Sequence, residues 1–226
     1  MNRFFYISPL VHQTFVWPIA RPMFRFFLHL KIKGVERLDR LPRGKGIIFA
    51  TNHTSELDPI LVPVSLPFLS PFMPIFYTSR EQSFYKRSGW RQFFYGGLLF
   101  KLWGSHSVKS GHKDYGVSLA THILLLKNGK SLCIFPEGRQ SRDGSLGEAH
   151  GGVAFLSHTT GSPVVPVAIK GVLKLTMREF LCRTRHAEII FGEPLYPRDL
   201  VSVSTPDVSS YKTGATLVLK KIAELL

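Results

Sequence analysis

Short apolar runs that alternate with helix-forming stretches are the feature of this sequence that most restricts its fold. Five runs of four to six residues are apolar and end at polar or turn-forming residues, as buried strands do: Gly46–Thr51, Ile75–Thr78, Ser131–Phe135, Val164–Ile169 and Ala187–Phe191. Helical patterns cover Phe84–Trp103, Asp114–Lys127, Gly152–His158 and Thr213–Leu226. This alternation predicts an α/β fold, a single domain with a mixed, mainly parallel sheet flanked by helices. The 226 residues are enough for one such core.

The first thirty residues are rich in aromatic and arginine side chains. They include Phe4, Phe5, Tyr6, Phe15, Trp17, Phe24, Phe26 and Phe27 beside Arg3, Arg21 and Arg25. This mixture is typical of helices that lie in the headgroup plane of a membrane. We expect residues 1–30 to form an interfacial helical arm of one or two helices, and residues 31–226 to form the globular domain. A helical hairpin packed on that domain is the alternative.

Two uncharged stretches have the apolar character that a membrane span requires. Phe4–Ala20 is short for a span and contains two prolines. Pro59–Ser79 is longer but contains five prolines, which a spanning helix does not accommodate. We therefore expect no transmembrane helix.

Positive charge dominates the composition. Lys and Arg number 29 against 15 Asp and Glu, a formal net charge of +14, and such a surface attracts nucleic acid, anionic lipid or a phosphorylated substrate. The 18 phenylalanines beside these cations favour a lipid surface. The sequence contains no recognition-helix, zinc-finger or RNA-binding aromatic motif, so we do not expect nucleic acid as a partner. A non-catalytic basic binding protein remains the alternative.

The two cysteines, Cys133 and Cys182, belong to no CxxC or Cys/His cluster. Such clusters are what structural zinc sites require, so we expect no metal. Cysteine usage this sparse fits a reducing cytoplasm.

A histidine and an aspartate follow the first predicted strand at an interval of five residues. They are His53 and Asp58, within the segment Asn52–Asp58. A neutral imidazole is a suitable base near pH 7, and a carboxylate that accepts from its second nitrogen fixes its tautomer. The interval predicts His53 in the turn before a helix and Asp58 in the first turns of that helix. A helix-capping Asp58 beside a half-buried His53 is the structural alternative.

A second polar segment, Phe135–Arg142, follows another predicted strand. Gly138 permits close backbone approach or a positive φ, and Arg139 and Arg142 supply donors for a phosphate. Ser141 adds a hydroxyl, and Glu137 can accept from a substrate hydroxyl or orient an arginine. A surface turn with solvated charges is the alternative.

The two segments are expected to meet in space although they lie far apart in the sequence. Active sites of α/β sheets gather at the carboxyl ends of the strands, and both segments begin where a strand ends. The candidate active site therefore combines the His53–Asp58 pair with the loop that follows the strand Ser131–Phe135.

In this order and context the two segments resemble the glycerolipid acyltransferases, the family typified by 1-acylglycerol-3-phosphate acyltransferase. Residues 104–110 and Val164–Ala168 align with two weaker blocks of that family, so the resemblance covers roughly residues 30–195. Where the family's third block has an arginine, this sequence has Gln140, and Ser110 stands at the arginine of the second block. These departures bear on the phosphate of the acceptor.

The resemblance implies an enzyme that transfers a fatty acyl chain from acyl-CoA or acyl carrier protein to the hydroxyl of a lysophospholipid, 1-acylglycerol-3-phosphate in the family's pattern. It assigns catalysis to His53 and Asp58. It assigns substrate binding to positions in and beside these motifs: Asn52, Lys109, Glu137, Gly138, Arg139, Ser141 and Arg142. It implies no cofactor beyond the thioester, and a peripheral enzyme at the cytoplasmic face of an anionic membrane. A different lysolipid acceptor, such as a lyso-aminolipid, and an inactive lysolipid-binding relative are the alternatives.

Overall fold

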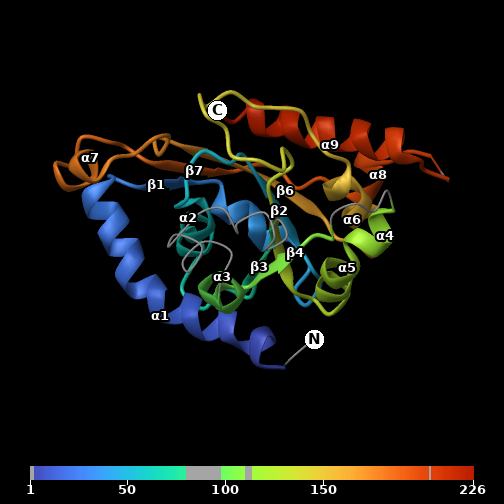
Figure 1. The fold of residues 1–226 in the computed structure, drawn as a ribbon, viewed down its shortest axis with the longest axis horizontal. Coiled ribbons are helices and arrows are strands. Elements are labelled where there is room, and N and C mark those ends of the chain that lie inside the picture. The colour runs from blue at the N-terminus through green and yellow to red at the C-terminus, as the bar shows by residue number, and fades with distance from the viewer. Residues whose placement is uncertain (1–2, 80–97, 110–113, 204) are drawn as a thin grey trace.

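The computed structural model describes residues 3–79, 98–109, 114–203 and 205–226, and these form one sheet with helices on both faces (Figure 1). The strands are β1 Lys31–Lys33, β2 Ile48–Thr51, β3 Ile75–Ser79, β4 Ser105–Ser107, β5 Ser131–Ile134, β6 Val164–Lys170 and β7 Glu188–Phe191. Their order across the sheet is β1-β7-β6-β2-β5-β3-β4. Only the pair β6–β7 is antiparallel among these neighbours. The predicted mixed, mainly parallel sheet is confirmed.

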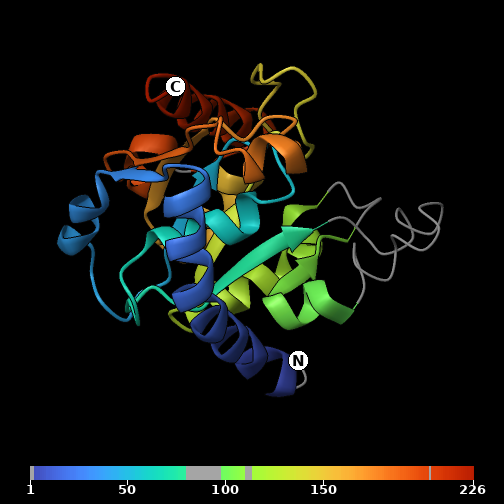
Figure 2. The same ribbon diagram turned by 90° about the vertical axis from the view of Figure 1, so that its left-hand side faces the viewer.

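Helices cover both faces of the sheet. They are α1 Arg3–Phe27, the 3₁₀ helix η1 Val35–Arg40, α2 Asp58–Ser65, α3 Leu98–Trp103, α4 Tyr115–Ser118, α5 Ala120–Lys127, α6 Gly152–Thr160, α7 Met177–Leu181, α8 Pro197–Leu200 and α9 Val208–Ala223. The long α1 and α9 lie on opposite sides of the sheet (Figure 1), and α1 crosses the side turned to the viewer in Figure 2.

Alternation along the central strand β2 divides the core into two layers. Phe49 packs with residues of α1 and α2, whereas Ile48 and Ala50 pack with residues of α5, α6 and α9. All three side chains are fully buried. Burial on both faces is the usual state of a parallel strand, and it explains why the run is continuously apolar.

The N-terminal helix is part of this core. One side of α1 buries Ala20 and Phe24, and the chain leaving it buries Leu28. The buried amide of Gln13 donates to the carbonyls of Ile75 and Trp103 and accepts from the Ile75 N–H, at 2.7, 3.0 and 2.9 Å respectively. The segment is a single helix fastened to β3 and α3, rather than a hairpin.

The opposite side of α1 is apolar and exposed. A stripe with a spacing of three or four residues exposes between 45% and 73% of Phe4, Ile7, Val11, Phe15 and Ile19. Spacing of this kind places side chains on one helix face. Within the part of the chain that the structure describes, no helix has the length and apolarity needed to cross a membrane.

The five predicted strands are all present, and the differences lie elsewhere. The edge strands β1 and β4 were not predicted, because each has three residues and is largely polar. The predicted helix Asp114–Lys127 is interrupted at Leu119, where φ −110° and ψ 14° separate α4 from α5. Most of the predicted helix Phe84–Trp103 lies outside the described residues, and α3 is its described end.

Candidate active site

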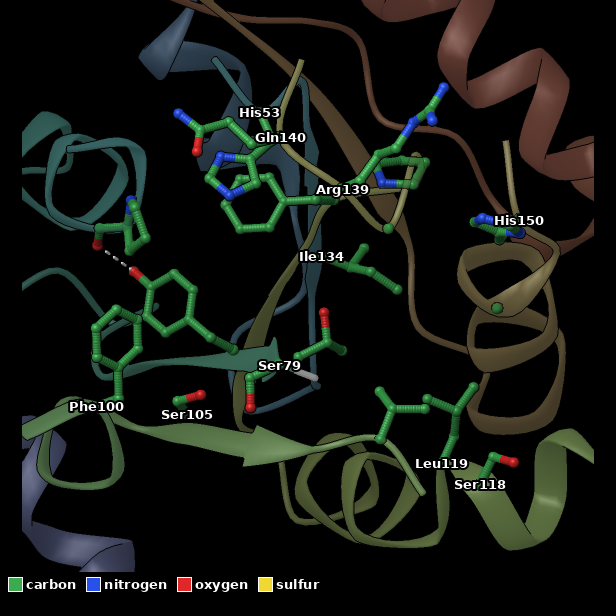
Figure 3. Close-up of a pocket in the computed structure, with 18 of the residues that line it drawn as sticks. His53, Ser79, Phe100, Ser105, Ser118, Leu119, Ile134, Arg139, Gln140 and His150 are labelled. Carbon is green, nitrogen blue, oxygen red and sulfur yellow. Dashed lines mark hydrogen bonds between the residues drawn. The ribbon is translucent and has the colours of Figure 1, made fainter. Parts of the chain in front are cut away.

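A pocket of about 730 Å³ lies where the carboxyl ends of β3, β4 and β5 approach the turn after β2 (Figure 3). Its apolar lining consists of Pro59, Tyr77, Phe100, Trp103, Val108, Tyr115, Leu119, Ile134, Phe135 and Pro136. Its polar or glycine lining consists of His53, Thr78, Ser79, Ser105, Lys109, Ser118, Gly138, Arg139, Gln140, His150 and Gly152. The two sequence motifs therefore meet at one pocket, as expected of parallel strands.

His53 and Asp58 form a hydrogen-bonded pair at the edge of this pocket. His53 lies in the turn and Asp58 is the first residue of α2, as the spacing predicts. His53 Nδ1 lies 2.9 Å from Asp58 Oδ2. The carboxylate is fully buried and the imidazole is 22% exposed. The tautomer that donates from Nδ1 to the carboxylate leaves Nε2 as an acceptor.

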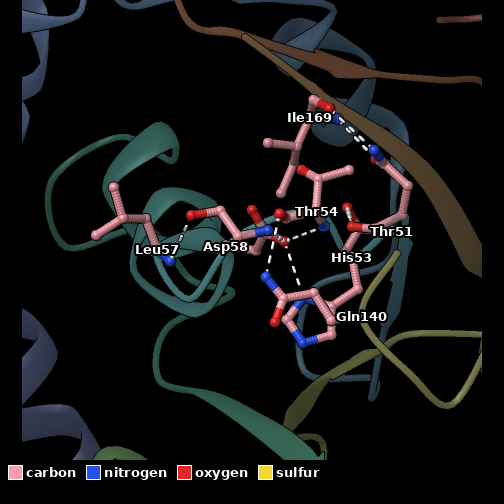
Figure 4. A network of polar contacts seen from close by, with 9 residues as sticks. Thr51, His53, Thr54, Leu57, Asp58, Gln140 and Ile169 are labelled. Carbon is pink, nitrogen blue, oxygen red and sulfur yellow. Dashed lines mark hydrogen bonds and ion pairs between the residues drawn. The ribbon is translucent and has the colours of Figure 1, made fainter. Parts of the chain in front are cut away.

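The same carboxylate oxygen organises the backbone of the turn. Oδ2 of Asp58 also accepts from the N–H groups of Thr54 and Ser55, at 2.7 and 2.9 Å (Figure 4). Asp58 therefore caps the turn, as the alternative expected, and is also hydrogen-bonded to His53. Buried amide donors left without this acceptor would destabilise the turn.

The loop after β5 holds the turn from its other side. The ring of Phe135 stacks on His53 with centroids 4.0 Å apart. The Ser141 N–H donates to the His53 carbonyl at 2.7 Å. The Gln140 side chain donates to the Thr54 carbonyl at 3.1 Å (Figure 4). Gln140, at the position of the family's arginine, therefore binds the turn that carries His53.

Asn52 faces the sheet rather than the pocket. Its amide donates to the Ile169 carbonyl at 2.9 Å and accepts from the Ile169 N–H at 2.8 Å. The side chain is 1% exposed and is not among the described residues that line the pocket. Both amide groups are thus used in fixing the end of β2 to β6, which gives Asn52 a supporting position and not the substrate contact expected from the sequence.

Glu137 and Gly138 shape the turn after β5. Glu137 is 4% exposed, and its Oε2 accepts from the Gly147 N–H at 2.7 Å. Gly138 has a φ of +63°, and a Cβ there would lie 3.0 Å from the ring of His150. A side chain at position 138 would therefore be strained by both conformation and contact.

The predicted cationic residues separate into two groups. Arg139 and Lys109 line the pocket, and Arg139 lies beside Gln140 and His53 in Figure 3. Ser141 and Arg142 are not among the described residues that line it. The Ser141 hydroxyl donates to the Ser145 carbonyl at 2.8 Å, which folds the loop back on itself, and Arg142 is exposed. Ser110 lies outside the described residues.

A family model described as Acyltransferase matches residues 29–170, more than half of the 226 residues. The chain belongs to the acyltransferase family. The resemblance found in its sequence motifs is confirmed, and the protein is an acyltransferase enzyme.

Several proteins named as acyltransferases are similar to this one. The 1-acyl-sn-glycerol-3-phosphate acyltransferase of Bacillus subtilis is 27% identical over 180 residues, covering 78% of this chain and 80% of that protein. A probable 1-acyl-sn-glycerol-3-phosphate acyltransferase of Mycoplasma pneumoniae is 22% identical over 199 residues, covering 81% of this chain and 70% of that protein. The crystal structure of the 1-acyl-sn-glycerophosphate acyltransferase PlsC of Thermotoga maritima, 20% identical, has a TM-score of 0.63 over 96% of this chain and 79% of that chain. This last similarity supports the fold.

Some residues of the acyltransferase pocket were not singled out from the sequence. Tyr77, Trp103 and His150 line it, and each lies on an element that reaches the site only through the tertiary fold. One indication of Tyr77 is present in the sequence: the strand Ile75–Thr78 is expected to end at the same sheet edge as the two motifs. Within the described ranges, no group of three or more His, Cys, Asp or Glu side chains is placed to hold a metal ion.

Proposed function

We propose that this acyltransferase moves a fatty acyl chain from a thioester to the free hydroxyl of a lysophospholipid, converting 1-acylglycerol-3-phosphate to phosphatidate. The observation that carries the proposal is the His53–Asp58 pair, 2.9 Å apart, at the edge of a pocket with an apolar interior. The relatives in Bacillus subtilis and Mycoplasma pneumoniae, both named as acting on this acceptor, support the choice of substrate.

In the proposed reaction His53 acts as general base. Its Nε2 takes the proton of the lysolipid hydroxyl as that oxygen attacks the thioester carbonyl. The C–O bond forms, the C–S bond of the tetrahedral intermediate then breaks, and the departing thiolate takes the proton from the imidazolium. Asp58 accepts from Nδ1 throughout and stabilises the positive imidazolium. The proposed reaction steps require no metal and no tightly bound cofactor.

The pocket offers a place for each part of the substrates. Aromatic and aliphatic side chains line its interior, which suits an acyl chain. Lys109 and Arg139 supply cationic groups for phosphate at its border. The donor is proposed to be acyl-CoA or acyl carrier protein, and because both are cytoplasmic, the reaction is placed at the cytoplasmic face of the membrane.

Arg139 is proposed to bind the acceptor phosphate, because Gln140 is committed to the catalytic turn. Replacing Arg139 with alanine is expected to raise KM for 1-acylglycerol-3-phosphate about tenfold or more, because a charge-assisted hydrogen bond to the phosphate is lost. The measurement compares kcat/KM for this acceptor with kcat/KM for monoacylglycerol, which has no phosphate. The native preference for the phosphorylated acceptor should narrow in the variant.

Arg142→Ala provides the comparison, since Arg142 lies outside the pocket lining. It should retain the native preference. A native protein that turns over a lyso-aminolipid faster than 1-acylglycerol-3-phosphate would overturn the proposed acceptor. An Arg142→Ala effect as large as that of Arg139→Ala would reject Arg139 as the particular phosphate ligand.

The exposed stripe of α1 is proposed to bind the membrane on which the lysolipid resides. Phe15 and Ile19 are its most exposed members, at 73% and 71%. The loop after α2 packs on another side of α1, where the ring centroids of Phe68 and Trp17 lie 5.0 Å apart, and Leu69 in that loop is 63% exposed. Apolar side chains beside arginines suit the interface of an anionic bilayer.

The double substitution of Phe15 and Ile19 by serine is expected to lower binding to liposomes of anionic phospholipid at least about tenfold, because two large side chains no longer enter the bilayer. Sedimentation of protein with the liposomes measures it. Deleting the whole helix would be a poorer test, since it removes buried Phe24 and Gln13. Val208→Ser, at a site 61% exposed on α9, is the control. Equal sedimentation of all three proteins would refute a membrane role for this stripe.

A further inference from the structure

The carbonyl of Pro59 at the start of α2 lacks its ordinary helical partner. In a regular helix that carbonyl accepts from the N–H four residues later. The residue four later is Pro63, which has no N–H. The position of this carbonyl matters because Pro59 directly follows Asp58, the carboxylate of the catalytic pair.

Two side chains from outside α2 provide the missing donors. The Tyr77 hydroxyl on β3 donates to the Pro59 carbonyl at 2.7 Å. The Trp103 indole N–H at the end of α3 donates to the same oxygen at 3.1 Å. Burial raises the pKa of Tyr77 well above its ordinary value, so the hydroxyl keeps its proton and remains a donor.

The carboxylate of Asp58 makes its hydrogen bonds through one of its two oxygens. Its Oδ2 holds His53, Thr54 and Ser55, whereas its Oδ1 has no hydrogen-bond partner among the described residues. Its orientation is therefore fixed by one oxygen and by the backbone that carries the side chain. Tyr77 and Trp103 hold that backbone at Pro59, the residue that directly follows Asp58.

We propose that Tyr77 and Trp103 are positioning residues for the catalytic pair, acting through their shared hydrogen bonds to the Pro59 carbonyl. The consequence for catalysis rests on the proposed function. Both side chains also line the pocket together with Pro59, so these hydrogen bonds lie in the wall proposed to receive the acyl chain. Small losses of alignment between a base and its substrate are costly in rate.

Tyr77→Phe tests the inference, because it removes the hydroxyl and keeps the ring. We expect kcat for thiol release to fall about tenfold, while KM for donor and acceptor stays within about twofold. Proton NMR supplies a readout that needs no substrate: the Nδ1–H of His53, bonded to Asp58, should give a downfield resonance that shifts or broadens in the variant. Tyr211→Phe, a tyrosine on α9, is the matched control and should change neither.

A second substitution distinguishes positioning from general damage. Pro63→Ala restores an N–H at the position that normally pairs with the Pro59 carbonyl, so adding it to Tyr77→Phe should recover part of kcat and the native resonance. If Tyr77→Phe does not fold, Trp103→Phe removes the other donor and tests the same carbonyl. An unchanged His53 resonance and unchanged kcat in a folded variant would overturn the inference. A native protein without acyl transfer would overturn the proposed function instead, and the NMR comparison would still decide the positioning role.

Discussion

Replacing His53 with alanine is expected to lower kcat at least about 10²-fold, the lower range for a lost general base. The imidazole lies at the pocket edge, 2.9 Å from the buried carboxylate of Asp58. Steady-state thiol release from palmitoyl-CoA with 1-acylglycerol-3-phosphate measures the effect. KM should change much less than kcat, because the imidazole accepts the proton in the transition state and does not hold the bound substrate.

His186→Ala is the matched control for this experiment. His186 is exposed, and its ring stacks on His29 with centroids 4.6 Å apart. It is not among the described residues that line the pocket. Native kcat in His186→Ala and a large loss in His53→Ala is the expected outcome. Undiminished turnover in His53→Ala would remove the histidine from the mechanism.

Replacing Asp58 with asparagine is expected to lower kcat about 10²-fold while leaving the protein folded. The amide oxygen can still accept from the N–H groups of Thr54 and Ser55, so the turn survives. What is lost is the negative charge that stabilises the imidazolium as His53 takes the substrate proton. Circular dichroism and kcat, measured on the same preparation, separate the two consequences.

Asp58→Ala is the companion variant, because it removes the acceptor as well as the charge. Thr54 and Ser55 would each have a buried N–H without a partner, at about 1–3 kcal/mol apiece. The free energy of unfolding should therefore fall in Asp58→Ala and change little in Asp58→Asn. If Asp58→Asn kept native kcat, Asp58 would be a capping residue without a part in catalysis.

The central sheet could be predicted from the sequence because its strands are apolar on both faces. Ile48, Phe49 and Ala50 are fully buried. Because both faces of β2 are buried, its residues form a continuous apolar run that can be recognised in the sequence. The edge strands β1 and β4 are short and largely polar, and their pairing comes from neighbouring strands rather than from their own residues. Long-range pairing of this kind leaves no local pattern to find.

The pairing of His53 with Asp58 could also be predicted, because the two residues are five positions apart in one turn. The contacts that hold this turn could not. Gln140 reaches Thr54 across 86 residues of sequence, and Asn52 reaches Ile169 across 117. Each contact joins two loops or strands whose proximity exists only in the folded protein, so residue type alone did not assign them.

The motif after β5 was only partly interpretable from its residues. Gly138 and Arg139 line the pocket, whereas Glu137 is buried, binds the Gly147 N–H and is not among the described residues that line the pocket. Ser141 does not face the pocket, because its hydroxyl closes the loop on the Ser145 carbonyl and accepts from the Gly144 N–H at 2.9 Å. Small polar side chains in loops often bond to nearby backbone in this way, and the sequence does not distinguish that use from substrate binding.

The N-terminal helix illustrates a similar limit. Its aromatic and arginine content predicted one or two helices at a membrane interface, and the structure has one helix with an apolar stripe exposed through Phe15 and Ile19. The opposite side is packed into the core, and Gln13 connects it to Ile75 and Trp103. A buried polar anchor of this kind is visible only when its partners are in place.

The most direct test of the mechanism is thiol release from palmitoyl-CoA, measured with and without 1-acylglycerol-3-phosphate, for the native protein and for His53→Ala. We expect release from the native protein only when the acceptor is present, and release at least about 10²-fold slower from His53→Ala, because His53 takes the proton of the attacking hydroxyl. Release that is independent of the acceptor, or equal in the two proteins, would contradict direct transfer catalysed by His53.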